Sequence, residues 1–484
     1  MVLAAIVTGP VHAQVDNLTQ SDHWVRLSDG KKLSYTVSAG RIPIRDGASE
    51  EVHGHMFFVA YRVASAKPRP VTFLWNGGPG SNSSTLHLES VGPQILGDAG
   101  GIVPFPDTAL ATTDLVFVDA VGTGFSRVAK PDYAKEFYQT RGDTLSFVEF
   151  VRAWRLLFAA EKSPLFIGGE SWGGHRAAEV AHVLQDNGVA VDGIIIISGR
   201  NALPLSQPDN TLRALRTVEQ ALAALHHGRL SPALGNDPRA IERQVTAWVL
   251  ETYAPALARL NTLTSAERDA LAEKLALFTA LPKSDIDRQT LIVTPAQFLR
   301  ELLRDEKKIL ATNDMHRLDV PAYGDREKAV ERYLRGALHY RTDSAYVDAA
   351  NPGWSPDSAS LQSVGDQWDY TKGYYATVMS ADEMRASNAA AIARGEPPGG
   401  QDTPAGAEAM ALNPAMRMLI AVGQKDSLMS CAATEETVRR QTLELQRRIT
   451  FRCYDGGHMF YYYPDARRKF SADLQAFISG RTFP

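Results

Sequence analysis

The chain is poor in cysteine, in net charge of either sign and in long apolar runs. It has two cysteines, Cys431 and Cys453, among 484 residues, which excludes a disulfide-rich scaffold and a zinc cluster built from cysteines. Lysine and arginine number 51 against 55 acidic residues, and the absence of a basic tract gives no support for nucleic-acid binding. Beyond the N-terminus, no apolar run is long enough to span a bilayer. With 44% hydrophobic and 22% charged residues, the composition is typical of a soluble globular protein.

The first residues have features of an export signal. Residues 2–7, VLAAIV, are apolar, and Val11-His12-Ala13 resembles a small-residue cleavage site before Gln14. A basic segment ahead of the apolar residues is missing. We interpret residues 1–13 as the remnant of a signal peptide and expect a periplasmic or secreted protein. The alternative is a short disordered apolar end.

Residues 14–200 alternate between strand and helix signals. The length exceeds that of one compact domain, so a core with a large insertion is expected. We expect a hairpin at 24–37, strands at 51–64, 70–75, 113–119, 165–167 and 191–198, and helices at 142–160 and 176–184. This order predicts an open and mostly parallel sheet.

Helical periodicity dominates residues 201–375, where strand signals fade. The helical stretches are 211–227, 238–253, 265–280, 295–309 and 325–340. We interpret this region as a helical cap insertion over the active edge of the sheet. Strand character returns at 416–422 and 449–454, followed by a helix at 465–478, so residues 376–484 are expected to complete the core.

One stretch leads from an apolar strand through a sharp turn into a helix. Residues 165–175 read LFIGGESWGGH and contain the G-x-S-x-G sequence Gly169-Glu170-Ser171-Trp172-Gly173. In a nucleophile elbow, the residues two before and two after the serine must be small, and the hydroxyl is pushed out above the sheet edge. Such a motif also occurs by chance, so an ordinary strand-to-helix turn is an equal alternative for the motif alone.

A serine nucleophile needs a base, an acid that orients the base, and donors for the oxyanion. Asp426 follows the penultimate strand in 423–426, GQKD, and His458 follows the last strand in 455–459, DGGHM. The chain order Ser171, Asp426, His458 is that of nucleophile-elbow hydrolases. We predict that His458 is the general base for Ser171 and that Asp426 orients it.

Other roles are open to these residues. Asp426 could cap the helix that starts near Ala432, and His458 could be a hydrogen-bonded structural histidine. Asp455 and Asp119 are rival acids. The elbow and the chain order together favour the triad over these alternatives.

A glycine-rich loop, NGGPGS at residues 76–81, follows an early strand. It lacks Gly-Lys-Ser/Thr and is therefore no phosphate-binding P-loop, and Pro79 argues against a dinucleotide fingerprint. Its glycines offer backbone N–H groups without side-chain obstruction. We predict Gly78 N–H and Trp172 N–H as the oxyanion donors, with a plain tight turn as the alternative.

With these residues in place, the chain resembles the serine carboxypeptidases, peptidases of the α/β-hydrolase fold that release C-terminal residues. The matching motifs, in family order, are WNGGPG at 75–80, DAVGTGFS at 119–126, GESWGG at 169–174, GQKD at 423–426 and GHM at 457–459. The resemblance implies an α/β-hydrolase core with a helical cap and the triad Ser171, Asp426 and His458. It further implies that Asn76, Gly77 and Glu170 bind the terminal carboxylate of the substrate.

One position departs from the family pattern. The family commonly has a second glutamate that shares a proton with the first, and counting along the sequence places it at Ser90, with Glu89 one residue earlier. A shared proton keeps one carboxyl neutral, so that it can donate to a carboxylate at low pH. Without the second glutamate, the acidic pH optimum that is usual in the family is not expected to follow from the resemblance. The low cysteine count, with Ser81 in place of a cysteine, resembles the bacterial branch.

We expect a serine carboxypeptidase that cleaves C-terminal bonds of a peptide or protein through an acyl-enzyme, without cofactor or metal. The alternatives are a proline aminopeptidase, against which Asn76 and Glu170 argue, an esterase or an acyltransferase of the same fold. A catalytically silent binding protein is a further alternative. Neither a nucleic-acid partner nor an integral membrane segment is expected, and the oligomeric state is open between monomer and homodimer.

Two residue pairs are left with two interpretations each. Cys431 and Cys453 lie near the two candidate catalytic loops and either pair or remain free buried thiols. His53 and His55 alternate along one strand and share a face. Without a third ligand nearby in sequence, they indicate a solvated strand rather than a metal site.

Overall fold

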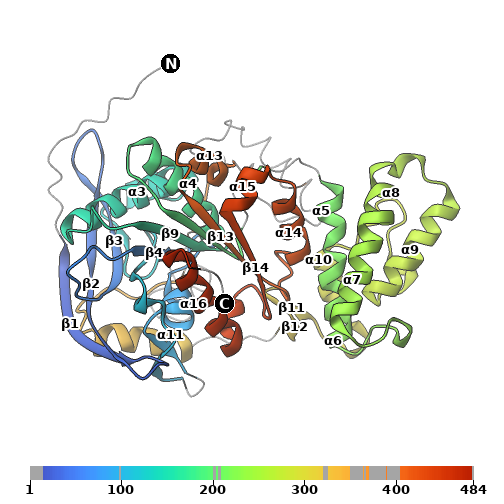
Figure 1. Cartoon of the computed structure of the whole chain (residues 1–484), viewed down its shortest axis with the longest axis horizontal. Coiled ribbons are helices and arrows are strands. Elements are labelled where there is room, and N and C mark those ends of the chain that lie inside the picture. The colour runs from blue at the N-terminus through green and yellow to red at the C-terminus, as the bar shows by residue number, and fades with distance from the viewer. Residues whose placement is uncertain are drawn as a thin grey trace.

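The computed structural model describes residues 15–97, 100–199, 203–204, 209–319, 325–348, 364, 367–369, 389 and 404–481. A large central sheet has helices on both faces, and a separate group of helices lies beyond one end of it (Figure 1). The expected signal remnant at 1–13 lies outside the described residues.

The main sheet carries the strand order β1-β2-β3-β7-β4-β9-β10-β13-β14, with β8 paired to β3. Its strands are β1 (Asp16–Arg26), β2 (Lys32–Arg45), β3 (Val52–Arg62), β4 (Val71–Trp75), β7 (Asp114–Val118), β8 (Arg127–Val128), β9 (Leu165–Glu170), β10 (Gly193–Ile197), β13 (Arg417–Gly423) and β14 (Ile449–Tyr454). The first strands pair antiparallel, and every pair from β7 to β14 is parallel. The predicted α/β-hydrolase architecture is confirmed.

The central strands are buried on both faces, as their continuous apolar runs predict. In β10, Ile194 and Ile196 pack into one hydrophobic cluster, and Ile195 and Ile197 pack into the cluster on the opposite face. Helices α3 (Thr140–Leu157), α4 (Trp172–Asp186) and α13 (Ala405–Leu412) cover the first face. Helix α16 (Pro464–Ser479) covers the second.

A helical group with its own hydrophobic core follows β10. It contains α5 (Asn210–Leu215), α6 (Thr217–His226), α7 (Pro238–Trp248), α8 (Ala254–Ala258), α9 (Ser265–Thr279) and α10 (Pro295–Glu301). The helix expected at 295–309 ends at Glu301 and is followed by a 3-10 turn at Arg304–Glu306. Beyond it, β11 (Leu310–Ala311) pairs with β12 (Asp314–Leu318). Helix α11 (Asp325–Arg332) packs instead against the core sheet, through Val330.

The remaining elements are short. They are α1 (Ser84–Leu86), the π-helical turn His87–Val91, the hairpin of β5 (Gln94–Leu96) with β6 (Ile102–Pro104), α2 (Ala134–Phe137), α14 (Cys431–Arg439) and α15 (Leu443–Arg448). Among the helices of the described residues, none combines the length and the apolar character needed to cross a membrane.

Candidate active site

Ser171 occupies a strained turn between β9 and α4. Its backbone has φ 56° and ψ −126°, a region that residues other than glycine rarely adopt. The turn is so tight that a Cβ on Gly169 would lie 1.9 Å from the Gly173 carbonyl oxygen. Glycine at these two positions is therefore a steric requirement, which is the local geometry expected of a nucleophile elbow.

Asp426 and His458 meet across the carboxyl ends of two neighbouring parallel strands. Asp426 follows β13 and His458 follows β14, and their Oδ2 and Nδ1 atoms lie 2.6 Å apart. Both side chains are buried, and the second oxygen of Asp426 accepts the Leu428 N–H at 2.7 Å. The carboxylate is thus fixed on both oxygens and holds the imidazole in one orientation.

The rival residues have other partners. Asp455 is largely exposed and pairs with Lys425 at 2.9 Å. Asp119 is buried at the end of β7, where it accepts the Ser83 N–H at 2.8 Å. Helix α14 is capped by Ser430 rather than Asp426, since the Ser430 hydroxyl accepts the Ala433 N–H. Among the carboxylates considered from the sequence, Asp426 is the one that orients His458.

The other ring nitrogen of His458 faces Glu170, the residue before Ser171. Nε2 lies 3.3 Å from Glu170 Oε1. Burial opposes protonation of the imidazole, but Asp426 and Glu170 outweigh it and raise the pKa of His458 to about 9. No hydrogen bond joins Ser171 to His458, both of which are described. Catalytic hydrogen bonds often tighten only when substrate is bound.

Asn76 joins the glycine-rich loop to Glu170. Its side-chain N–H donates to Glu170 Oε2 at 2.7 Å, while its Oδ1 accepts the Leu86 N–H at 3.1 Å. Burial raises the pKa of Glu170, and the interactions with His458 and Asn76 only partly offset this. A neutral Glu170 carboxyl can donate a hydrogen bond to an anion.

The glycine-rich loop packs directly on the elbow. A Cβ on Gly77 would lie 2.5 Å from the Trp172 nitrogen and 2.7 Å from the Glu170 carbonyl oxygen. Gly78 has φ +105°, which favours glycine. The two predicted oxyanion donors, Gly78 N–H and Trp172 N–H, therefore come from two backbone segments in contact.

A buried ion pair that the sequence did not indicate holds this loop. Arg176, in the first turns of α4, donates to the Asn76 carbonyl oxygen at 2.8 Å and pairs with Asp143 of α3 at 2.5 Å. The three residues are far apart in sequence, so no local pattern relates them. The sequence shows only that Arg176 lies five residues after Ser171, and it does not reveal the partners of Arg176.

The counted position, Ser90, and its neighbour Glu89 both lie in the π-helical turn His87–Val91. Ser90 is fully buried in the π-helical turn His87–Val91, whereas Glu89 forms an ion pair with Arg326 of α11. Burial raises the pKa of the Tyr462 phenol, and both Glu89 and Glu170 add to this. The two glutamates therefore act on one phenol, with an arginine beside Glu89.

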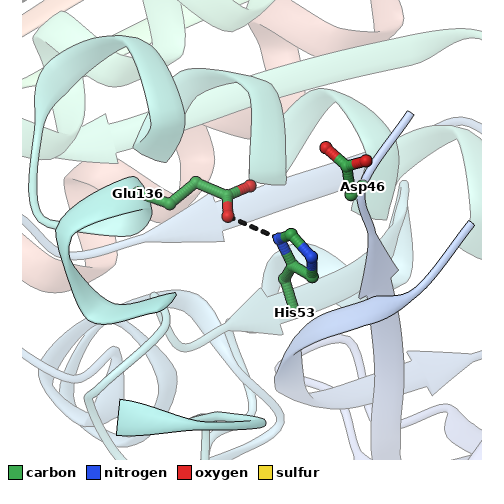
Figure 2. Close-up of side chains that lie close together, drawn as sticks. All are labelled: Asp46, His53 and Glu136. Carbon is green, nitrogen blue, oxygen red and sulfur yellow. Dashed lines mark hydrogen bonds and ion pairs between the residues drawn. The ribbon is translucent and has the colours of Figure 1, made fainter. Parts of the chain in front are cut away.

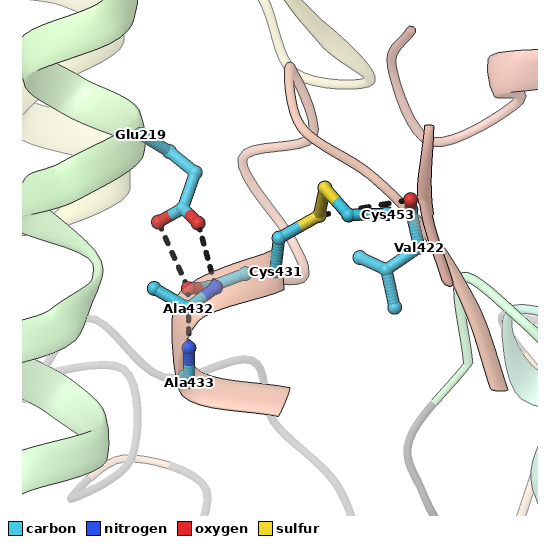
Figure 3. Close-up of a disulfide and its surroundings, with 7 residues drawn as sticks. Glu219, Val422, Cys431, Ala432, Ala433 and Cys453 are labelled. Carbon is cyan, nitrogen blue, oxygen red and sulfur yellow. Dashed lines mark hydrogen bonds between the residues drawn. A yellow bond between two sulfur atoms is a disulfide. The ribbon is translucent and has the colours of Figure 1, made fainter. Parts of the chain in front are cut away.

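The loop between β13 and α14, which carries Asp426 and is called the acid loop below, is held by contacts on two sides (Figure 3). Cys431 of α14 and Cys453 of β14 form a disulfide with Cα atoms 5.8 Å apart, so the free-thiol alternative is wrong. From α6, Glu219 accepts hydrogen bonds from the Ser430 hydroxyl at 2.8 Å and the Ala432 N–H at 3.1 Å. Burial raises the pKa of Glu219 to about 7.

A small cavity separates the helical group from this loop. Arg216 spans it, donating to the carbonyl oxygens of Ser427 at 2.9 Å and Leu428 at 3.0 Å. The lining residues are Arg216, Glu219, Gln220, Pro295, Met315, Asp426, Ser427 and Met429. The helical group thus contributes part of the surface beside Asp426.

Part of the chain is similar in sequence to known proteins. Residues 38–197 match the family model for serine carboxypeptidases. A pheromone-processing carboxypeptidase kex1 of Aspergillus niger is 33% identical over 149 residues, which are 30% of this chain and 24% of that protein. The pheromone-processing carboxypeptidase KEX1 of Ajellomyces capsulatus is 34% identical over 172 residues, 34% of this chain and 26% of that protein. The chain matches about a quarter of the length of these relatives.

A solved structure covers more of the chain at lower identity. The prohormone-processing carboxypeptidase Kex1(delta)p from Saccharomyces cerevisiae is 15% identical, with a TM-score of 0.48, over 92% of this chain and 91% of its own. Residues 38–197, which contain the glycine-rich loop and the elbow, are similar to the serine carboxypeptidases. Asp426 and His458 lie outside that match and are brought to the site by the fold.

Proposed function

We propose that the protein is a serine carboxypeptidase in which Ser171, His458 and Asp426 form the catalytic triad. The observation that carries this is the buried 2.6 Å contact between Asp426 and His458 at the sheet edge that also carries the strained Ser171 turn. The family match of residues 38–197 supports the same activity.

Each residue has a defined role in this mechanism. Ser171 Oγ attacks the scissile carbonyl while His458 Nε2 accepts its proton, and the resulting oxyanion is bound by the N–H groups of Gly78 and Trp172. His458 then gives the proton to the leaving amino acid, which leaves an acyl-enzyme on Ser171. Water attacks the ester with His458 again as base. Asp426 stabilises the imidazolium in both steps.

Substrate selection is proposed to rest on the carboxylate of the last residue. The Gly77 N–H and a neutral Glu170 carboxyl would donate to it, and Asn76 holds Glu170 in place. The raised pKa of Glu170 supports this role because it extends the pH range in which the carboxyl carries a proton. An aminopeptidase has no use for such a group.

The mechanism is tested by covalent labelling and by one substitution. A fluorophosphonate probe should label Ser171, and Ser171→Ala should lower kcat by roughly 10⁴-fold or more while the far-UV circular dichroism is unchanged. Full turnover by the alanine variant would remove Ser171 from the mechanism. Absence of labelling in an otherwise folded protein would favour the binding-protein alternative.

We further propose export to the periplasm or the outside of the cell. Two observations support it: the apolar residues 2–7 with a small-residue site before Gln14, and the disulfide between Cys431 and Cys453, a bond that persists in oxidising compartments. Cell fractionation with N-terminal sequencing of the purified protein should find a mature chain that starts near Gln14. An unprocessed chain with reduced cysteines in the cytoplasm would contradict export.

A further inference from the structure

We propose that Asp46, His53 and Glu136 form a binding site for a divalent cation of the zinc type. One potential ligand atom from each residue lies within 4.8 Å of the other two. Figure 2 shows His53 between Glu136 and Asp46. The residues come from three elements: Asp46 follows β2, His53 lies in β3 and Glu136 lies in α2. The third ligand that the sequence did not reveal next to His53 is supplied by a segment 83 residues away.

All three side chains are held in place by neighbours. The His53 ring stacks on Tyr133 with centroids 3.8 Å apart, and its Nδ1 lies 2.6 Å from Glu136 Oε2. Asp46 Oδ1 accepts the N–H groups of Ala48 at 3.1 Å and Ser49 at 2.8 Å. These contacts limit the movement of the His53 ring and of the Asp46 carboxylate, so less conformational entropy is lost when a cation binds.

The charges at the site favour a cation. Among the described ion pairs, His53 is the one basic side chain that meets either carboxylate. Lys130 is paired with Glu51, and the guanidinium of Arg45 donates to the Glu50 carbonyl oxygen at 2.8 Å. Two carboxylates therefore share one imidazole, and a divalent ion would neutralise them.

The donor set suits zinc better than calcium or magnesium. Zinc binds both imidazole nitrogen and carboxylate oxygen, with water in an open fourth position, whereas calcium and magnesium prefer oxygen ligands. Tetrahedral bonds of about 2.1 Å place ligand atoms about 3.4 Å apart. The ligand atoms lie within 4.8 Å of one another, so binding requires small side-chain movements and replaces the hydrogen bond between His53 and Glu136.

The cation would join the start of the sheet to a segment that reaches the elbow. Two residues beyond Glu136, the Tyr138 carbonyl oxygen accepts the Asp369 N–H at 2.8 Å. The neighbouring Trp368 ring packs against Trp172, with centroids 6.1 Å apart. None of the three ligands contacts the proposed triad, so the role that fits this position is structural.

Zinc titration of the whole chain tests the proposal. Chelator-treated protein is titrated with ZnCl₂ by calorimetry, and the thermal midpoint is measured with and without zinc. The wild-type chain should bind one zinc ion at this site and gain thermal stability. His53→Ala should weaken binding at least tenfold and abolish the gain, and Glu136→Gln and Asp46→Asn should do the same if the alanine variant fails to fold.

His55→Ala is the matched control. His55 lies two residues along the same strand, shares the face of His53 and pairs with Asp16 at 3.3 Å, so its loss should leave zinc binding unchanged. Equal binding by wild type and His53→Ala would overturn the proposal and place any bound zinc elsewhere, including at His458. Absence of zinc binding by the wild type, or equal loss in His55→Ala, would overturn it as well.

Discussion

At the scale of single residues, the carboxylate of Glu170, next to Ser171, contributes to the raised pKa of the proposed base, His458. His458 can accept a proton only when neutral, and its pKa is raised to about 9 by Asp426 and Glu170 against the effect of burial. In the free enzyme, kcat/KM should therefore rise as pH increases toward about 9. At pH values where Glu170 is ionised, Glu170→Gln removes one of the two charges that stabilise the imidazolium. We expect the rising limb to move to lower pH.

The measurement is the pH profile of kcat/KM on an uncharged ester, which does not need carboxylate recognition. Glu179→Gln is the matched control, because Glu179 is a buried glutamate of α4 whose carboxylate lies near His175 rather than His458. Its profile should coincide with that of the wild type. A rising limb that stays in place in Glu170→Gln would show that Glu170 does not hold the charge of His458.

A second residue-scale prediction concerns the contact between the two loops. In Gly77→Ala, the new Cβ would lie 2.5 Å from the Trp172 nitrogen, and backbone on both sides has to move. We expect kcat to fall by roughly 10²-fold or more through displacement of one oxyanion donor. Gly47→Ala is the control, because a Cβ there meets no atom within 4 Å. Equal kcat values for the two variants would contradict the placement of the donors.

The sequence predicts the residues of the site better than the contacts that hold them. Ser171, Asp426 and His458 follow strands of one parallel sheet, so their meeting at a common edge can be deduced from chain order. Arg176 with Asp143, and Glu89 with Arg326, are paired by tertiary structure alone. Each pair joins segments whose distance in space no local pattern reveals.

At the scale of elements, α14 follows the loop that carries Asp426, and β14 precedes the loop that carries His458. The disulfide joins these two elements. Cys431 lies five residues after Asp426, and Cys453 lies five residues before His458. The bond closes a loop across a sequence separation of 22 residues, so its loss should cost about 3 kcal/mol of unfolding free energy. Urea unfolding of Cys431→Ser should show this loss. Cys453→Ser and the double variant should show the same loss, and additive losses would contradict a single shared bond.

Helix α6 positions the acid loop from the other side. Glu219→Ala leaves the Ser430 hydroxyl and the Ala432 N–H without their acceptor, which should cost about 1–3 kcal/mol and lower kcat. Glu273→Ala in α9 is the control, because Glu273 is exposed and pairs with Lys283 on the surface. Urea unfolding and kcat should both be unchanged in the control. A Glu219→Ala variant with wild-type kcat would show that the helical group does not position Asp426.

Elements with long apolar runs are predicted from the sequence, and those fixed by pairing are not. The strands β4, β7, β9, β10 and β13 follow expectation within a few residues, because burial on both faces requires continuous apolar side chains. The β11–β12 pair lies between the two helical stretches expected at 295–309 and 325–340, where no strand is expected. Its strands have two and five residues and are stabilised by pairing with each other, which the local sequence does not reveal.

At the scale of the whole molecule, buried carboxyls make the protein more stable in acid than in alkali. Burial raises the pKa values of Asp119, Glu149 and Glu219 to about 7. The folded state then binds protons that the unfolded state releases above about pH 4, so stability falls as pH rises toward 7. His458, with its pKa raised to about 9, stabilises the fold below about pH 6.5, and this contribution is lost as pH rises through 9.

Both effects have the same sign, so the urea midpoint should be higher at pH 5 than at pH 9. The measurement is equilibrium unfolding at the two pH values, with wild type and Glu219→Gln side by side. The glutamine cannot ionise, and the difference between the two pH values should shrink in that variant. A midpoint that rises from pH 5 to pH 9 would contradict the assigned burial of these carboxyls.

Recognition of the substrate's terminal carboxylate is the central claim, and one comparison of substrates tests it most directly. An N-blocked dipeptide and its C-terminal amide differ only in the group that Gly77 and Glu170 are proposed to bind. Because a hydrogen bond to a charged group contributes about 1.5–3 kcal/mol, the acid should be hydrolysed roughly 10 to 100 times faster in kcat/KM below neutral pH. Equal hydrolysis of acid and amide would contradict the assignment as a carboxypeptidase.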